Sequence, residues 1–295
     1  MLTITHQALS ELAAKARAYA DVFQLPLQHR VWKGQTGDFM GSGIGSSLDF
    51  QDHRSYMPGD DPRHINWQAY ARTGSYTMKL YREEVRPMID LVLDVSDSMW
   101  VQEEKQNRAL ELFYFVFYSA LRSGAAISTS VVRGDRFEHL TDDAVHSHAW
   151  SRRLDGMPET SAAASPDLRP LPFRAQSMRV LVSDLLFTES PDKLLRALTR
   201  NKGRGLILAP YVNSEANPDW DGNYEFVEAE SRLKHPHRVE RNLLKKYLTA
   251  YQRHFDIWKT LCRKYDVALA RIPSETDFQA AMQAEAVANS AVEIM

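Results

Sequence analysis

The chain has 295 residues, of which 44% are hydrophobic and 25% are charged, and its formal net charge is −2. This composition is ordinary for a soluble globular protein, and the lack of a basic excess argues against a nucleic-acid partner. The single cysteine, Cys262, excludes an intrachain disulfide and fits a reducing compartment. No uncharged apolar run reaches the roughly 18 residues needed to cross a bilayer. The first residues also lack the pattern of a signal peptide, so we expect a cytoplasmic protein without a membrane span.

The first 87 residues predict a helix followed by a mixed accessory segment. Apolar residues at helical spacing indicate a helix from His6 to about Phe23. The stretch "GQTGDFMGSGIGSS" is rich in glycine and serine and indicates a loop. In "RSYMPGDDPRHINWQAYAR" a Pro-Gly turn is followed by Asp60 or Asp61, which can cap a short helix. A strand is expected in "YTMKLYREEV".

From Met88 onward, predicted strands alternate with predicted helices. The apolar runs "MIDLVLD", "RVLVSDLLF" and "GLILAPYV" have strand length, and "ISTSVV" and "RFEHL" indicate a hairpin. Helices are expected in "EEKQNRALELFYFVFYSALRSG" and "SPDKLLRALTRNKG", from about Val239 to Lys264, and near 277–288. This alternation predicts a mainly parallel sheet covered on both faces. Ligands of such sheets bind outside the carboxyl ends of the strands.

The stretch "LVLDVSDSMW" ends an apolar strand with oxygen-bearing side chains at alternate positions, Asp94, Ser96 and Ser98. Oxygens at this spacing can converge in a tight loop, and Mg²⁺ binds about six oxygens while keeping some of them as water. Asp184, at the end of a second apolar strand, can complete the set directly or through water. A cation neutralised by so few carboxylates favours binding of a partner's carboxylate over catalysis. The alternative is a helix N-cap cluster, in which Ser and Asp bond to local backbone.

"DVSDS", followed later by "VSD" at another strand end, resembles the metal-ion-dependent adhesion site of von Willebrand factor A domains. That family's pattern is Asp-x-Ser-x-Ser, then a threonine from a second loop and an aspartate from a third. The resemblance implies these metal ligands: Asp94, Ser96, Ser98, Asp184 and Thr160. Thr160 lies in "MPETSAAAS", where Ser161 is the alternative ligand.

The segment before this strand resembles the bacterial group known as domain of unknown function fifty-eight. That group carries the pattern Arg-x-Tyr-x-x-Gly-Asp-Asp-x-Arg-x-Ile-x-Trp, which runs here from Arg54 to Trp67. With the adhesion-site motif, the resemblance covers roughly Gly41 to Ile272. It implies work beside a MoxR-type AAA+ ATPase in assembling or activating a client protein.

Two other functions compete with this interpretation. A strand-end aspartate is also found in phosphatases of the haloacid-dehalogenase type, where it forms a covalent intermediate. That chemistry needs a second aspartate two residues later, and position 96 is serine. A metal-independent scaffold is the other alternative, docking through Arg54, Arg63 and Arg72.

We therefore predict two regions, an N-terminal helix with an accessory segment over residues 1–87 and a von Willebrand factor A-like domain over residues 88–295. The predicted fold is a three-layer, Rossmann-like α/β structure with a mainly parallel central sheet. The expected function is non-enzymatic: a Mg²⁺ or Mn²⁺ site that binds an acidic residue of a partner protein.

Overall fold

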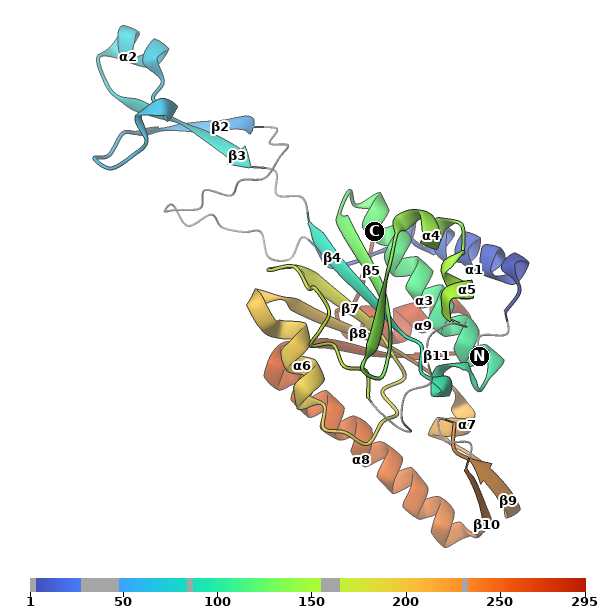
Figure 1. The fold of residues 1–295 in the computed structure, drawn as a ribbon. Helices are drawn as coiled ribbons and strands as arrows, with labels where there is room; N and C mark the ends of the chain where they lie inside the picture. Colours follow the sequence, from blue (N-terminus) through green and yellow to red (C-terminus); the bar gives the residue numbers. More distant parts are fainter. Residues whose placement is uncertain (1–3, 28–47, 84–86, 155–164, 230–232) are drawn as a thin grey trace. The chain divides into compact units, whose positions relative to one another are not determined.

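The computed structural model describes residues 4–27, 48–83, 87–154, 165–229 and 233–295 (Figure 1). The chain divides into two compact units. The larger comprises Met1–His29 and Pro87–Met295, and the smaller, Arg30–Arg86, is inserted between these two stretches of sequence. Within the described residues, none of the helices combines the length and apolar character that a bilayer span requires.

The larger unit is built on a six-stranded sheet with the strand order β11-β8-β7-β4-β5-β6. Its strands are β4 (Met88–Asp94), β5 (Ala126–Arg133), β6 (Arg136–Leu140), β7 (Met178–Val182), β8 (Arg204–Tyr211) and β11 (Ala268–Pro273). Neighbouring strands pair in parallel from β11 to β5, and the edge strand β6 pairs antiparallel to β5. The predicted α/β architecture with a mainly parallel sheet is confirmed.

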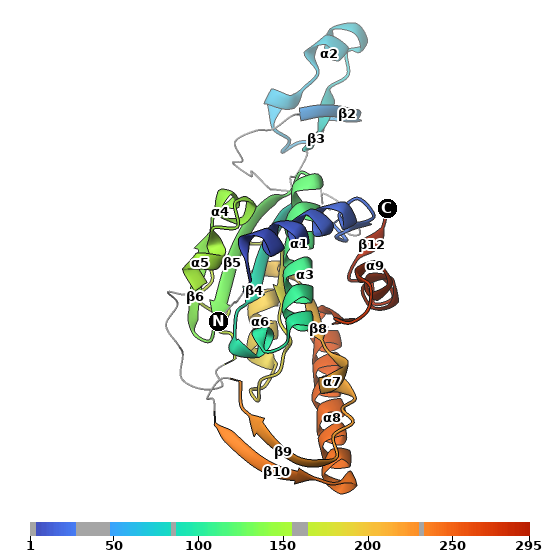
Figure 2. The same ribbon diagram turned by 90° about the vertical axis from the view of Figure 1, so that its right-hand side faces the viewer.

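Helices cover both faces of this sheet (Figures 1 and 2). One apolar cluster joins one face to α1 (His6–Tyr19), α3 (Glu103–Arg122), α4 (Asp142–His146), α5 (Trp150–Leu154) and α9 (Phe278–Ala281). A second cluster joins the other face to α6 (Asp192–Thr199) and α8 (Arg241–Tyr265). Short helical segments complete the unit: η2 (Asp97–Trp100), η3 (Arg200–Lys202), α7 (Asn213–Ala216) and the π-helical turn η4 (Met282–Val287).

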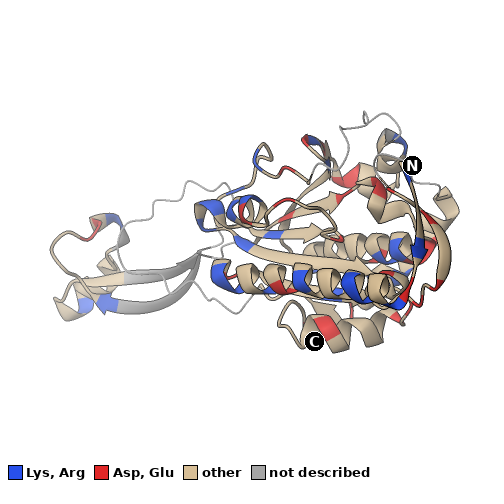
Figure 3. Ribbon diagram, turned by 90° about the horizontal axis from the view of Figure 1, so that it is seen from below, with Lys and Arg blue, Asp and Glu red and all other residues tan. Residues whose placement is uncertain are grey.

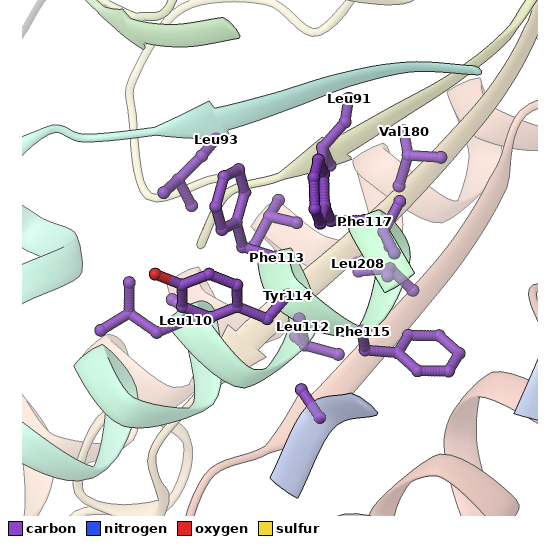
Figure 4. Close-up of a cluster of buried hydrophobic side chains, with 14 of the residues drawn as sticks. Leu91, Leu93, Leu110, Leu112, Phe113, Tyr114, Phe115, Phe117, Val180 and Leu208 are labelled. Atoms are coloured by element: carbon purple, nitrogen blue, oxygen red, sulfur yellow. The ribbon is translucent and has the colours of Figure 1, made fainter. Parts of the chain in front are cut away.

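The alternation of strand side chains explains why two separate cores form. Leu91 and Leu93 of β4 belong to the cluster with α3, whereas Val92 between them belongs to the cluster with α8. Figure 4 shows Phe113 and other apolar side chains of α3 gathered beneath β4. Helix α3 is buried on several sides because α1 packs on it opposite the sheet, through Leu9 and its helical neighbours.

Two short pairings were not predicted from the sequence. Strand β1 (Phe23–Gln24) pairs antiparallel with β12 (Glu293–Ile294), so the helix predicted to reach Phe23 ends at Tyr19. Strand β9 (Gly222–Val227) pairs with β10 (Lys234–Val239), which directly precedes α8.

The smaller unit contains the antiparallel strands β2 (Leu48–Ser55) and β3 (Thr77–Glu83), with η1 (Pro62–His64) and α2 (Trp67–Thr73) between them. Asp61 is the N-cap of η1, where its carboxylate accepts a hydrogen bond from the backbone N–H of Arg63. Asp60, the alternative cap, instead binds Arg54.

Candidate functional site

The carboxyl ends of β4 and β7 bring Asp94 and Asp184 to the same edge of the sheet. The two strands are neighbours in a parallel pair in which Leu93 lies opposite Val182, so the residues that follow them leave the sheet together. Asp94 is 1% exposed and Asp184 is 3% exposed. Burial raises the pKa of Asp94 to about 7, and the charge of Asp184 adds to the shift. The predicted pair of strand-end carboxylates therefore forms one buried acidic site.

The loop after Asp94 is held by this carboxylate. The backbone N–H of Ser96 donates to Asp94 Oδ1 at 3.0 Å, and the hydroxyl of Ser183 donates to Asp94 Oδ2 at 2.7 Å. The hydroxyls of Ser96 and Ser98 lie 3.2 Å apart. Ser96 occupies the N-cap position of η2, yet its side chain makes no capping hydrogen bond. The two hydroxyls are thus paired with each other beside Asp94 and do not cap the helix.

Asp97, in the middle of the same loop, belongs to a different contact. Its carboxylate accepts a hydrogen bond from Arg133 at 2.5 Å, and Arg133 also donates to the backbone carbonyl of Val95 at 3.1 Å. Asp97 is therefore an anchor of the loop and not a member of the acidic site.

Lys105, on the first turn of α3, is a member of the site that the sequence analysis missed. Its ammonium lies 3.0 Å from Asp184 Oδ2 and 2.5 Å from Glu215 Oε1, and the side chain is 1% exposed. Burial lowers the pKa of Lys105, but the carboxylates of Asp184 and Glu215 more than offset this, and the pKa stays above its ordinary value. The sequence did contain one indication that Lys105 is buried. Lys105 lies four residues before the buried Ala109, and residues at this spacing share one face of a helix.

Asp184 is held from two sides. Its Oδ1 accepts a hydrogen bond from the backbone N–H of Leu186 at 3.1 Å, while its Oδ2 accepts from Lys105. The backbone turns sharply between Asp184 and Leu186, since the intervening Leu185 has a φ of 62°. The position of this carboxylate is consequently fixed before any ligand binds.

The donor set fits a hydrated Mg²⁺ or Mn²⁺ ion. It consists of carboxylate and hydroxyl oxygens, which these cations prefer, and each oxygen of Asp94 keeps a second lone pair beyond its hydrogen bond. Among the described residues, no group of three or more His, Cys, Asp or Glu side chains gathers in a metal-binding arrangement.

The remaining predicted ligand lies outside this description. Thr160 and its alternative Ser161 fall in residues 155–164, which the structure does not describe.

The predicted docking arginines belong to the smaller unit, where acids of the same motif engage two of them. Arg54 donates to both carboxylate oxygens of Asp60, at 2.7 and 2.6 Å. Arg63 pairs with Asp61 at 2.7 Å and keeps 77% of its side chain exposed. Arg72 donates to the backbone carbonyl of Gln68 in its own helix. The motif thus builds the turn between β2 and η1.

The sequence family that matches this chain is described as "Protein of unknown function DUF58", and the match covers residues 52–256, more than half of the chain. The chain belongs to the DUF58 family. The matched range includes the whole motif from Arg54 to Trp67 in the smaller unit, together with the acidic site at the sheet edge. Membership in this family does not indicate an activity, because the family description states none.

Curated relatives of this DUF58 chain include the uncharacterized proteins Mb1516 of Mycobacterium bovis and Rv1480 of Mycobacterium tuberculosis. Each is 25% identical over 184 residues, which span 59% of this chain and 57% of the relative. Among solved structures, an aerotolerance-related membrane protein from Bacteroides fragilis matches 61% of this chain and 98% of its own, with 12% identity and a TM-score of 0.29. At that TM-score the match supports no conclusion about this chain.

Proposed function

We propose that this chain is a protein-interaction module of the von Willebrand factor A type, whose sheet-edge site holds Mg²⁺ or Mn²⁺ and binds an acidic residue of a partner. The observation that carries the proposal is the convergence of Asp94, the Ser96–Ser98 hydroxyl pair and Asp184 at one edge of the sheet. The DUF58 match supports the proposal, and so does the mainly parallel sheet with helices packed on both of its faces.

The side chains around the ion have separable roles in this proposal. The hydroxyls of Ser96 and Ser98 would bind the ion, with Asp94 and Asp184 placed to bind it or its water. By resemblance, Thr160 supplies a further oxygen. The ammonium of Lys105 already balances Asp184, so the cation keeps unneutralised charge that attracts a carboxylate from outside.

A partner follows from the family resemblance. We propose a MoxR-type AAA+ ATPase, with this chain as its adaptor toward a client protein. An aspartate or glutamate of the partner would fill the open coordination position of the ion.

Titration with Mn²⁺, followed by calorimetry or water-proton relaxation, tests the metal site. Asp94→Asn and Ser96→Ala should each weaken Mn²⁺ binding at least about tenfold, since each removes an oxygen donor from a small set. Glu104→Gln is the matched control, because it removes an exposed carboxylate on the first turn of α3, just after the same loop. Wild-type protein that binds no Mn²⁺, or equal loss in the Glu104 variant, would refute the site.

The hydrolase alternative is chemically weaker at this geometry. Both oxygens of Asp94 accept hydrogen bonds from Ser96 and Ser183, and no second carboxylate lies two residues on. An assay with generic phosphate esters and Mg²⁺ separates the two functions. Turnover that disappears in Asp94→Asn would establish the enzyme instead of the adaptor.

One observation favours the metal-independent scaffold as a second candidate. The smaller unit exposes Met57 (64%), Trp67 (57%) and Tyr76 (48%), large apolar side chains of the kind found at protein interfaces. A pull-down of the partner that compares Arg63→Ala with Ser96→Ala distinguishes the candidates. Loss in the arginine variant alone would assign binding to the smaller unit.

A further inference from the structure

Helix α8 concentrates positive charge in a chain whose net charge is −2. Its 25 residues include seven Lys or Arg and one acidic residue, Asp256. All seven basic side chains are exposed. Figure 3 shows that Lys and Arg residues recur along this long helix and that few acidic residues lie between them. The remainder of the chain is consequently acidic.

Four of these basic residues share one edge of the helix. Each basic residue of this edge lies three, four or seven positions from the next residue of the edge, which places them all on one side of the helix. The edge consists of Arg241, Lys245, Gln252, Asp256, Lys259 and Arg263. Lys246 and Lys264 each lie one position further along the chain, about 100° around the helix, on the side that carries Arg253.

A pocket of about 660 Å³ opens beside the middle of this edge. Its walls come from α8, from the end of α7 and from the carboxyl ends of β8 and β11, and its polar lining includes Asn217, Gln252, Arg253, Asp256 and Arg271. Two guanidinium groups and one carboxylate give the lining an excess of positive charge. The pocket lies at the same carboxyl edge of the sheet as Asp94, beyond β7.

Arg271 is the most constrained cation of this pocket. Its guanidinium carbon stacks 3.6 Å from the ring centre of Phe255 and 4.5 Å from that of Tyr211. Its Nη2 donates to the hydroxyl of Tyr251 at 2.5 Å. Within the described residues its Nε is buried and has no hydrogen-bond partner. A carboxylate that enters the pocket would be attracted by the positive charge of this guanidinium.

We propose that the Arg271 pocket and the adjoining edge of α8 bind an acidic segment of a partner protein. One carboxylate of the segment enters the pocket toward Arg271, and its other acidic residues lie along Lys245 and Lys259. A protein segment fits better than a nucleic acid, because a peptide can place a neutral residue beside Asp256, whereas every nucleotide carries a phosphate. This surface shares no residue with the metal site, so its occupancy does not depend on the proposed cation.

Fluorescence anisotropy with a labelled glutamate-rich peptide of about ten residues tests this surface, in the full chain and at low salt. The double variant Lys245→Glu/Lys259→Glu should weaken binding at least about tenfold, because it replaces attraction by repulsion along the edge. The control, Lys193→Glu/Lys202→Glu, makes the same charge change at exposed lysines of α6 and η3, outside the pocket lining and the α8 edge, and should alter binding by less than about twofold.

Two further arms complete the experiment. Asp94→Asn should bind the peptide as wild type does, which separates this surface from the metal site. Equal losses in both lysine double variants would overturn the proposal, since binding would then follow overall charge alone. Tighter binding of a single-stranded DNA of equal charge, or of anionic vesicles, would also overturn it in favour of that class of partner.

Discussion

Lys105 joins three elements through one ammonium group. It is buried in α3 and bonds to Asp184 after β7 and to Glu215 in α7. The hydroxyl of Tyr247 in α8 donates to the backbone carbonyl of Glu215 at 2.8 Å, which extends the connection to the long helix. The acidic site is therefore linked to α8 by a series of polar contacts.

Replacing Lys105 by methionine should destabilise the fold by about 3–5 kcal/mol, because it leaves Asp184 and Glu215 without their buried counter-charge. Urea denaturation followed by circular dichroism measures the change. Lys193→Met is the control, since that lysine is 73% exposed. A loss no larger than that of the control would show that the buried contact contributes nothing to stability.

His148 makes stability depend on pH. It is 6% exposed, and its Nδ1 lies 2.7 Å from the hydroxyl of Tyr114. Burial, with the neighbouring rings of His6 and His146, lowers the pKa of His148 below its ordinary value of 6.5. The unfolded chain therefore binds the proton first as pH falls. The contribution of His148 to stability is complete above about pH 6.5 and declines as the pH falls below that value.

Urea midpoints measured between about pH 7.5 and about pH 5.5 separate this contribution from that of Asp94, whose raised pKa of about 7 stabilises the fold as pH falls. His148→Gln should gain stability relative to the wild type as pH falls, because glutamine does not titrate. His235→Gln, which replaces an exposed histidine of β10, is the control. An identical slope in all three proteins would assign the pH dependence to other groups.

At the residue scale, sequence reasoning found the side chains that follow strands and missed those that reach the site from elsewhere. Asp94 and Asp184 were predictable because apolar strands end at them and parallel strands share an edge. Lys105 and Glu215 were not, because no local pattern brings the start of α3 beside the short helix α7. The site's balance of charge is a property of tertiary packing.

At the scale of elements, the junction between α6 and β8 depends on a glycine. Arg179 of β7 is fully buried and donates to the carbonyls of Ala197 and Leu198 at 2.9 and 3.2 Å. A methyl group at Gly203 would overlap the guanidinium of Arg179. This close approach explains why no larger residue stands at position 203, immediately before β8.

Gly203→Ala should therefore destabilise the protein by about 1–3 kcal/mol through overpacking. Chemical denaturation measures the cost. In an Arg179→Ala background the same substitution should cost little, because the overlapping group is absent. Additive losses in the double variant would contradict this explanation.

Strand β10 shows why one element escaped prediction. Its sequence "KHPHRV" contains a proline and lacks apolar alternation, and each of its residues before Val239 is exposed. Pairing with β9 holds it in place, with Pro236 opposite Glu225. Without a buried face, a strand leaves no periodic signal in the sequence. By contrast, β4, β7 and β8 are buried throughout most of their length and were recognisable as continuous apolar runs.

At the scale of the whole molecule, the larger unit is built from two stretches of sequence, one before and one after the inserted smaller unit. Helix α1 precedes the insertion yet packs on α3, which follows it. Leu9, Ala13 and Ala16 are at most 3% exposed in this contact. The described residues 4–27 thus complete the core formed by residues after 87.

Deleting residues 1–20 should expose the outer face of α3 and remove several kcal/mol of stability, at about 1.5–3 kcal/mol for a fully buried side chain such as Leu9. Calorimetry should show a lower Tm, and an apolar dye should bind the truncated protein. Glu11→Ala, a change on the exposed face of α1, is the control. A truncated protein with the wild-type Tm and no dye binding would show that α1 is dispensable.

The pairing of Phe23 with Ile294 sets an order of events during translation. Phe23 is synthesised about 270 residues before its strand partner Ile294. At roughly 5–20 residues per second, the interval is on the order of tens of seconds. Throughout that time a nascent chain of this protein carries an unclosed strand edge next to an apolar helix. Association between neighbouring nascent chains is therefore most favoured on the polysome, before Ile294 has been added.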